Sequence, residues 1–270
     1  MPERTYVNAS MRFAAPMDAE PEIFFYEPDP ERIKIDPVYD SHEVRIQDLR
    51  GRESEATLDT LGFQLIHIDA TVDAFAETNA VKAQYYPAVG ALVRDAVGAR
   101  EVHVFDHNFR SNVVTEKDTA NANPVRLVHN DYTDLSGPQR LRELMPDRAD
   151  ELLRRRFAFI NLWRPLSHLA EDWPLGVCAA RSIKAEDYVT LALRYPDRDG
   201  QIYLVRHNPE HEWYYVSRMR TDEALLLKVY DSADDGRARF TPHSAFKDPT
   251  SRPGVPTRIS IEARTIAFFD

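Results

Sequence analysis

The sequence predicts a mainly β protein with flanking helices, and two observations favour an antiparallel sandwich or jelly roll. From residue 157 onward, short apolar runs are separated by turns containing Pro, Gly and Asp, a pattern typical of such folds. The chain also holds 18 Pro against 9 Gly, which favours stiff connections between short elements. No alternation of strand and helix suggests a parallel sheet.

The first hundred residues are expected to form an arm and a helical support. Strands are predicted at residues 6–13 and 44–49, and residues 21–37 form an extended arm with an aromatic cluster at 24–26. Residues 58–68 are interpreted as a helix end, a stop at Gly62 and an apolar strand. Apolar positions at helical spacing then predict a long helix over residues 73–97, interrupted at Pro87.

Residues 101–270 are expected to form the β core of a single domain that spans the whole chain, 1–270. A strand over 102–107 precedes a polar loop over 111–123, which is expected to be mobile. An apolar run over 124–128 then predicts a strand, and short helices are expected at 135–145 and 147–156. The later strands are predicted at residues 157–163, 175–183, 201–207, 213–217, 224–230, 239–240 and 257–269.

Composition narrows the classes of function. The net charge is −10 and the isoelectric point is near 5.4, which argues against a nucleic-acid partner because phosphate binding requires basic surfaces. The single Cys178 excludes an internal disulfide framework. No apolar segment follows the N-terminus, so we expect a cytoplasmic enzyme without membrane insertion. The expected partner is a small molecule, and the sequence indicates no oligomeric state.

The stretch after the apolar run at 124–128 contains the first candidate for chemistry. Residues two apart on a strand point to the same face, so His129 and Asp131 present an imidazole and a carboxylate together, while Asn130 points away. These are two of the three groups in the 2-His-1-carboxylate triad that holds non-haem Fe(II). The triplet alone is weak evidence, because it occurs by chance in many chains.

A second histidine must come from elsewhere, and His243 fits best. It precedes the final strand, and a jelly roll places an early His-x-carboxylate strand beside a late strand. The alternative for His243 is a hydrogen-bonded histidine in the turn after Pro242. Four other histidines are weaker candidates: His103 and His107 have helical spacing in a strand-like segment, and His207 and His211 flank a probable turn.

The final strand offers a site for a carboxylate. Arg258 and Ser260 share a strand face, and a guanidinium beside a hydroxyl suits charge-assisted, bidentate binding of a carboxylate. The alternative is that these residues form only the solvated face of a half-buried terminal strand.

His129-x-Asp131, His243 and Arg258-x-Ser260 stand in the order seen in the Fe(II)/2-oxoglutarate dioxygenase superfamily. Within it, the chain resembles the CmcJ/AsaB-type hydroxylase/desaturase family of secondary metabolism, which includes cephalosporin 7α-methoxylase components. The resemblance covers residue 100 to the end, and residues 1–100 match loosely. Its blocks are residues 127–133, 161–165, 208–215, 228–232 and 240–249.

The resemblance implies a double-stranded β-helix in which His129, Asp131 and His243 hold Fe(II). It also implies that 2-oxoglutarate chelates the metal and places its distal carboxylate at Arg258 and Ser260, with O2 as the second co-substrate. The interval of 15 positions from His243 to Arg258 exceeds the usual ten or so, which leaves Arg264 as a second choice.

A catalytic domain of this kind oxidises an unactivated C–H bond of a small secondary metabolite or amino-acid-like substrate, by hydroxylation, desaturation or cyclisation. Two alternatives remain: a cupin-type metalloenzyme that does not use 2-oxoglutarate, and a non-catalytic β-sandwich that binds a carboxylate. An arginine near the mouth would suit a substrate that carries a carboxylate. Candidate substrate contacts are Asn130, Trp163, Arg164, Tyr203, Arg206 and the aromatic cluster at 24–26.

Overall fold

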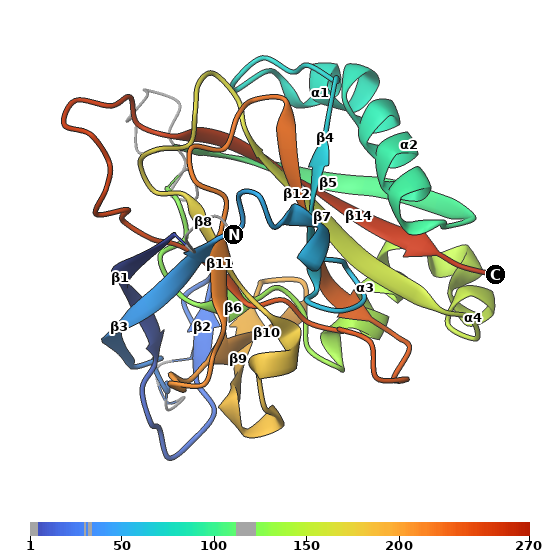
Figure 1. Ribbon diagram of the computed structural model, residues 1–270. Helices are drawn as coiled ribbons and strands as arrows, with labels where there is room; N and C mark the ends of the chain where they lie inside the picture. Colours follow the sequence, from blue (N-terminus) through green and yellow to red (C-terminus); the bar gives the residue numbers. More distant parts are fainter. Residues whose placement is uncertain (1–4, 30, 32–33, 112–122) are drawn as a thin grey trace.

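Two facing β-sheets form the framework of the protein. In a computed structural model, which describes residues 5–29, 31, 34–111 and 123–270, the larger sheet has nine strands and the smaller has five (Figure 1). The larger sheet runs in the order β1 (Tyr6–Ala14), β3 (Tyr39–Asp48), β11 (Trp213–Tyr215), β8 (Leu175–Cys178), β13 (His243–Ala245), β6 (His129–Asn130), β10 (Asp199–Val205), β9 (Tyr188–Arg194) and β2 (Glu22–Phe24).

The smaller sheet runs in the order β4 (Phe63–His67), β12 (Glu223–Asp231), β7 (Phe157–Pro165), β14 (Ile259–Phe268) and β5 (Glu101–Ser111). Its pairings are all antiparallel, whereas the larger sheet has parallel pairings between β11 and β3 and between β2 and β9. The predicted mainly β fold with a jelly-roll core is confirmed.

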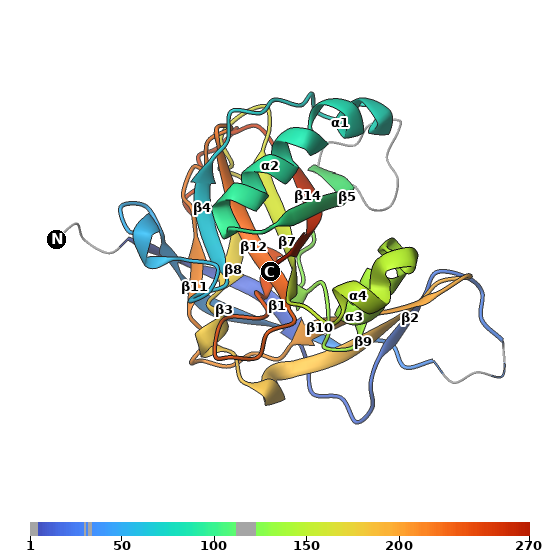
Figure 2. The ribbon, with the colours of Figure 1, turned by 90° about the vertical axis from the view of Figure 1, so that its right-hand side faces the viewer.

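Helices cover one face of the smaller sheet. The helices α1 (Thr78–Gln84) and α2 (Tyr86–Val97) lie along this sheet, while α3 (Ser136–Leu144) and α4 (Ala149–Leu152) lie near β9 and β10 (Figure 2). Short 3-10 helices occur at Glu53–Glu55, Pro146–Arg148, Ala180–Ser182 and Ala185–Asp187. No helix within the described ranges is both long and apolar enough to span a bilayer.

Strand β7 shows why the two layers hold together. Every residue of Phe157–Pro165 is buried, because alternate side chains enter two different cores. Phe159 packs into the core between the sheets, together with Val177 and Leu225. Ile160 packs on the opposite face, in the core beneath α2 that contains Val89. A nearly continuous apolar run is what such a doubly buried strand requires.

Several boundaries differ from those expected. The helix over 73–97 begins only at Thr78 and is divided into α1 and α2, with Pro87 tolerated in the first turn of α2. Residues 58–61 form turns and not a helix end, and β9 was not predicted. The pair 239–240 is not a strand; the strand follows at His243–Ala245. Most of the polar loop predicted at 111–123 lies outside the described residues.

The first hundred residues do more than support the core. Strands β1, β2 and β3 extend the larger sheet, and β4 forms one edge of the smaller sheet. The helical support is present as α1 and α2. The N-terminal segment is therefore part of the same two sheets as residues 101–270.

Gly62, in the turn before β4, packs against Thr241, which lies two residues before the candidate ligand His243. Its φ angle is +89°, and an added Cβ would lie 2.3 Å from Thr241 Oγ1. The Thr241 hydroxyl contacts the carbonyl oxygens of Gly62 at 2.7 Å and Lys228 at 2.8 Å. Glycine is required here both for the left-handed backbone and for the close approach.

We expect Gly62→Ala to destabilise the protein more than Gly51→Ala. Gly51 also has a positive φ, +75°, but no atom lies within 4 Å of its added Cβ. Gly51→Ala should therefore cost only backbone strain, about 1 kcal/mol. Gly62→Ala should add an overpacking penalty of about 1–3 kcal/mol. Urea unfolding of both variants measures the difference, and equal losses would contradict the role of Thr241.

Candidate metal centre and adjoining cavity

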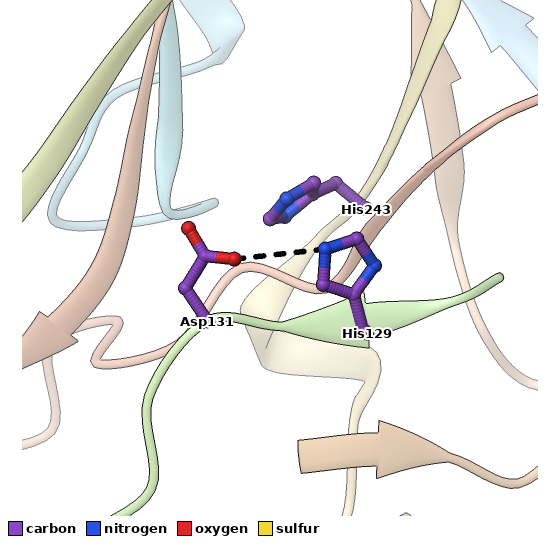
Figure 3. A group of neighbouring side chains, drawn as sticks. All are labelled: His129, Asp131 and His243. Carbon is purple, nitrogen blue, oxygen red and sulfur yellow. Dashed lines mark ion pairs between the residues drawn. The ribbon is translucent and has the colours of Figure 1, made fainter. Parts of the chain in front are cut away.

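Three side chains from two distant segments of the chain converge at the centre of the larger sheet. His129 lies in β6, Asp131 follows this strand directly, and His243 opens β13, where it is paired opposite His129 (Figure 3). Their potential ligand atoms all lie within 4.8 Å of one another, and His129 Nε2 is 3.6 Å from Asp131 Oδ1. With metal–ligand bonds of about 2 Å, one ion can be reached by small side-chain rotations.

Both histidines are held in the form that binds a metal. His129 Nδ1 lies 2.7 Å from the carbonyl oxygen of Leu127, and His243 Nδ1 lies 2.9 Å from that of Thr241. A carbonyl oxygen only accepts, so each Nδ1 donates its proton, and in the neutral ring Nε2 is the nitrogen that carries the lone pair for a metal. Such support of the second ring nitrogen is typical of metal-binding histidines.

The pKa shifts of His243 and Asp131 suit a cation, whereas that of His129 reflects its contact with Asp131. Burial and the neighbouring His129 lower the pKa of His243, which keeps this ring neutral. Burial lowers the pKa of His129, but the hydrogen bond and charge of Asp131 outweigh it and the net shift is upward. For Asp131, burial is outweighed by His129, Arg264 and His243, so the pKa of this carboxyl falls below its usual range.

Asn161 on β7 orients the carboxylate ligand. Its Nδ2 donates to Asp131 Oδ2 at 2.6 Å and to Glu262 Oε1 at 2.8 Å. Arg264 Nε lies 3.9 Å from the same Oδ2. Both contacts are made to Oδ2, which leaves Oδ1 directed toward His129.

Arg258, immediately before β14, is a buried cation that pairs with no carboxylate among the described residues. It is 2% exposed; its Nη1 donates to the carbonyl oxygen of Trp173, and its Nε has no partner among the described residues. Its guanidinium lies over the Trp163 ring at 5.3 Å. Burial, together with the charge of Arg110, lowers the pKa of Arg258 to about 9. An uncompensated buried charge is costly, so this arrangement favours an incoming anion.

Arg264, the second-choice carboxylate site, is already neutralised. Its Nη1 donates to Asp106 Oδ2 at 3.1 Å, and its Nε lies 3.4 Å from Glu262 Oε1. Burial lowers the pKa of Arg264, but the charges of Asp131 and Glu262 raise it by more, so the net shift of the pKa is upward. Ser260, by contrast, is fully buried and lies two residues from Arg258.

An open cavity of about 200 Å³ borders Asp131 and Arg264. Its walls come from β5, α3 and the β9–β10 hairpin, so it lies where Figure 2 shows α3 beside β9 and β10. Phe105 and Tyr132 provide aromatic surface, and Leu193 provides aliphatic surface. Of the three candidate ligands, Asp131 is therefore the one that borders an open approach.

Two of the proposed substrate contacts are corrected by their surroundings. Asn130 is fully buried: its Nδ2 donates to the carbonyl oxygens of Tyr132 and Val229, and its Oδ1 accepts from Thr241 N. Arg164 lies on the helix-facing side of β7, where it donates to the carbonyl oxygen of Ala70 and lies over the Tyr85 ring. Neither side chain lines the cavity.

The other substrate candidates lie around the cavity and not on its wall. Tyr203 packs against Tyr188 and Phe240, and its hydroxyl contacts Asp134. Arg206 donates to a surface carbonyl, and Trp163 lies beneath Arg258. From the aromatic cluster at 24–26, Phe25 stacks at 4.4 Å on Tyr195, which does line the cavity.

Sequence reasoning missed Asn161 and Glu262 as parts of the site. Asn161 is the one polar residue among the first seven residues of the apolar strand β7, which was a usable signal. Glu262 was interpreted only as part of the alternating face of the final strand. The remaining histidine candidates lie elsewhere: His107 contacts the Tyr86 hydroxyl, and His211 pairs with Asp187.

Comparisons with known proteins identify the family. Residues 11–268 match a family model described as an oxidoreductase/YMDC permease-like domain. The chain is 38% identical to the hydroxylase/desaturase efuI of Hormonema carpetanum, with 86% of this chain and 85% of that protein covered. It is 32% identical to the Fe(II)/2-oxoglutarate-dependent dioxygenase nvfI of Aspergillus novofumigatus, with 98% of both covered. The chain belongs to the Fe(II)/2-oxoglutarate-dependent hydroxylase/desaturase family.

A solved member of this dioxygenase family has the same fold. The iron and alpha-ketoglutarate-dependent endoperoxidase NvfI superimposes with a TM-score of 0.85 at 28% identity, and 98% of each chain is covered. The family suggested by the sequence is thereby confirmed, and membership extends to the N-terminal residues that had matched only loosely.

Loss of the Asn161 amide should weaken metal binding without unfolding the protein. We expect Asn161→Ala to lower affinity for Fe(II) by about 10–100-fold, the usual cost of losing a group that orients a ligand. Anaerobic Fe(II) titration measures this. Asn8→Ala, at an exposed position on β1, is the control and should bind as wild type does. Unchanged affinity in Asn161→Ala would contradict the orienting role.

Proposed function

We propose that this enzyme oxidises an unactivated C–H bond of a small-molecule secondary metabolite, using Fe(II) held by His129, Asp131 and His243. The convergence of two imidazoles and one carboxylate, on a site bordered by an open cavity, carries the proposal. This donor set suits Fe(II) and leaves positions open for co-substrates. When bound, Fe(II), 2-oxoglutarate and O2 supply the oxidant that removes the hydrogen atom.

The distal carboxylate of 2-oxoglutarate is assigned to Arg258 and Ser260. The buried Nε of Arg258 lacks a partner, and this guanidinium has no ion pair with a carboxylate in the described part of the chain. A carboxylate placed there would satisfy the donor and compensate the buried charge. Arg264 is the weaker choice, because its guanidinium already donates to the carboxylates of Asp106 and Glu262.

The protein's own residues prepare the site. Leu127 and Thr241 hold the two imidazole rings through their carbonyl oxygens. Asn161 turns the Asp131 carboxylate, and Trp163 supports the Arg258 guanidinium. These groups make no new bond during the reaction; they fix where the co-substrate and the C–H bond lie. Hydroxylation, desaturation and cyclisation remain the proposed outcomes.

The proposed function is tested by anaerobic addition of Fe(II) and 2-oxoglutarate. Wild type should develop the weak visible charge-transfer band of such a chelate, and should release succinate when O2 is admitted. His129→Ala should give no band, because it removes a ligand. His42→Ala, which removes a surface imidazole paired with Asp40, is the control and should retain the band. A chelate without succinate release would instead favour the cupin-type alternative.

Arg258→Gln should raise the KM for 2-oxoglutarate by about 30-fold or more, because losing one partner of a buried charge pair costs about 2 kcal/mol or more. Fe(II) affinity should stay close to that of wild type. Arg264→Gln should show the opposite pattern, with weaker metal binding and a nearly unchanged KM, since Arg264 contacts Asp131. Succinate production at varied 2-oxoglutarate measures both variants, and a reversed pattern would assign the carboxylate to Arg264.

A further inference from the structure

The cavity beside Asp131 carries many charges on its wall, and each arginine among its described lining residues is already paired with a carboxylate. Its lining contains four carboxylates and three guanidiniums. Their pairing determines what kind of molecule can enter, because an unpaired buried charge attracts its opposite, whereas a paired one must first be separated.

On the outer wall, Glu143 of α3 neutralises two arginines. It accepts from Arg140 at 2.8 Å, and Arg198 of the β9–β10 hairpin lies 3.9 Å from the same carboxylate. Each guanidinium also lies over an aromatic ring: Arg140 over Phe105 at 5.5 Å and Arg198 over Tyr195 at 4.3 Å. Both cations are therefore already compensated by an anion and by a ring face.

The remaining charges of the wall are paired in the same way. Arg264 contacts Asp106 at 3.1 Å on the inner side of the cavity. Asp199, near the mouth, is paired at 2.7 Å with Arg194, which stands behind the wall. Asp131 is the metal ligand of the proposed function. The lining thus has no surplus of positive charge. Its fourth carboxylate, Asp199, is balanced by Arg194, which is not part of the lining.

Uncharged groups make up the rest of the wall. Leu193 and Ile202 are aliphatic, Tyr132 and Tyr195 are aromatic, and Gln139 and Gln201 carry amides. Gln139 also donates to the carbonyl oxygen of Asp199 at 2.7 Å, which ties α3 to the hairpin. Such a wall offers apolar ring surface with neutral hydrogen-bonding groups at its edge.

We propose that this cavity selects an uncharged substrate, with a hydrophobic ring body and carbonyl or hydroxyl groups at its edge, and that Glu143 excludes carboxylates. This rests on the proposed function, because it takes the cavity beside Asp131 as the substrate site. A substrate carboxylate would have to displace Glu143 from Arg140 and Arg198 while losing its own hydration. The sequence had allowed for a carboxylate-bearing substrate; the pairing favours its neutral counterpart.

Two probes of equal shape test this: 1-naphthamide, which is neutral, and 1-naphthoate, which is an anion. Isothermal titration of the protein loaded anaerobically with Fe(II) and 2-oxoglutarate should show the amide binding at least tenfold more tightly. Equal or tighter binding of the naphthoate would overturn the proposal. The charge-transfer band is recorded on the same samples, so a failed chelate is distinguished from a wrong charge preference.

The variant Glu143→Gln provides the sharper test. It leaves Arg140 and Arg198 without their shared carboxylate, so naphthoate should gain at least tenfold in affinity relative to the amide. Glu186→Gln makes the same change in charge at an exposed position outside the cavity and should keep the wild-type ratio. No gain in Glu143→Gln would overturn the role of Glu143.

A second variant covers the case in which Glu143→Gln does not fold. Arg140→Gln leaves Glu143 with Arg198, at 3.9 Å, as its remaining cation, beside the neutral hydrogen bond from Gln139 at 3.0 Å. The ammonium probe 1-naphthylmethylamine should then gain affinity relative to the amide, compared with wild type. An unchanged ratio would show that these pairs do not set the charge preference.

Discussion

The pairing of β6 with β13 is the constraint on which the site depends. It places His243 directly opposite His129, although 114 positions separate them in the chain. Because β6 is only two residues long, its position needs further support, which Asn130 provides through the backbone of β12 and Thr241. A shift of one residue in the register of β6 against β13 would place the two imidazoles on opposite faces of the sheet. Asn130 thus has a structural role, whereas its neighbours His129 and Asp131 are the candidate metal ligands.

Strand β14 divides the interior into a polar and an apolar half. Before Thr265, the side chains facing β7 residues Trp163 and Asn161 are Glu262 and Arg264, which join the network around Asp131. Beyond it, Ile266 enters the apolar core between the sheets. The opposite face of the strand packs beneath the helices throughout. One strand therefore supplies charge where the metal ligands lie and hydrophobic packing where stability is needed.

Sequence reasoning succeeded where a local rule applied and failed where the partner was remote. Strand alternation correctly placed His129 and Asp131 together and Asn130 apart, and it could have shown that Arg164 must face away from Trp163. Alternation also predicted that Arg258 and Ser260 share a strand face, but no sequence pattern indicates that Arg258 lacks an ion pair within the described residues. The contact between Asn161 and Glu262 joins residues 101 positions apart, and no periodicity indicates such a pair. The ion pairs across the cavity, such as Arg198 with Glu143, could not be predicted from the sequence for the same reason.

The hydrogen bonds of the two histidines have a consequence for how such enzymes diversify. Each ring is fixed by a carbonyl only two residues away, so the geometry of the metal ligands is stored within short segments of chain. Most of the cavity wall instead comes from α3 and the β9–β10 hairpin, which contribute no candidate ligand, although Asp131 borders the cavity as well. Under the proposed function, substitutions in those surface elements would change which substrate is bound without moving His129 or His243. The residues that would hold the metal and most of those that would contact the substrate therefore lie on different elements, so substrate recognition can change without altering the geometry of the metal site.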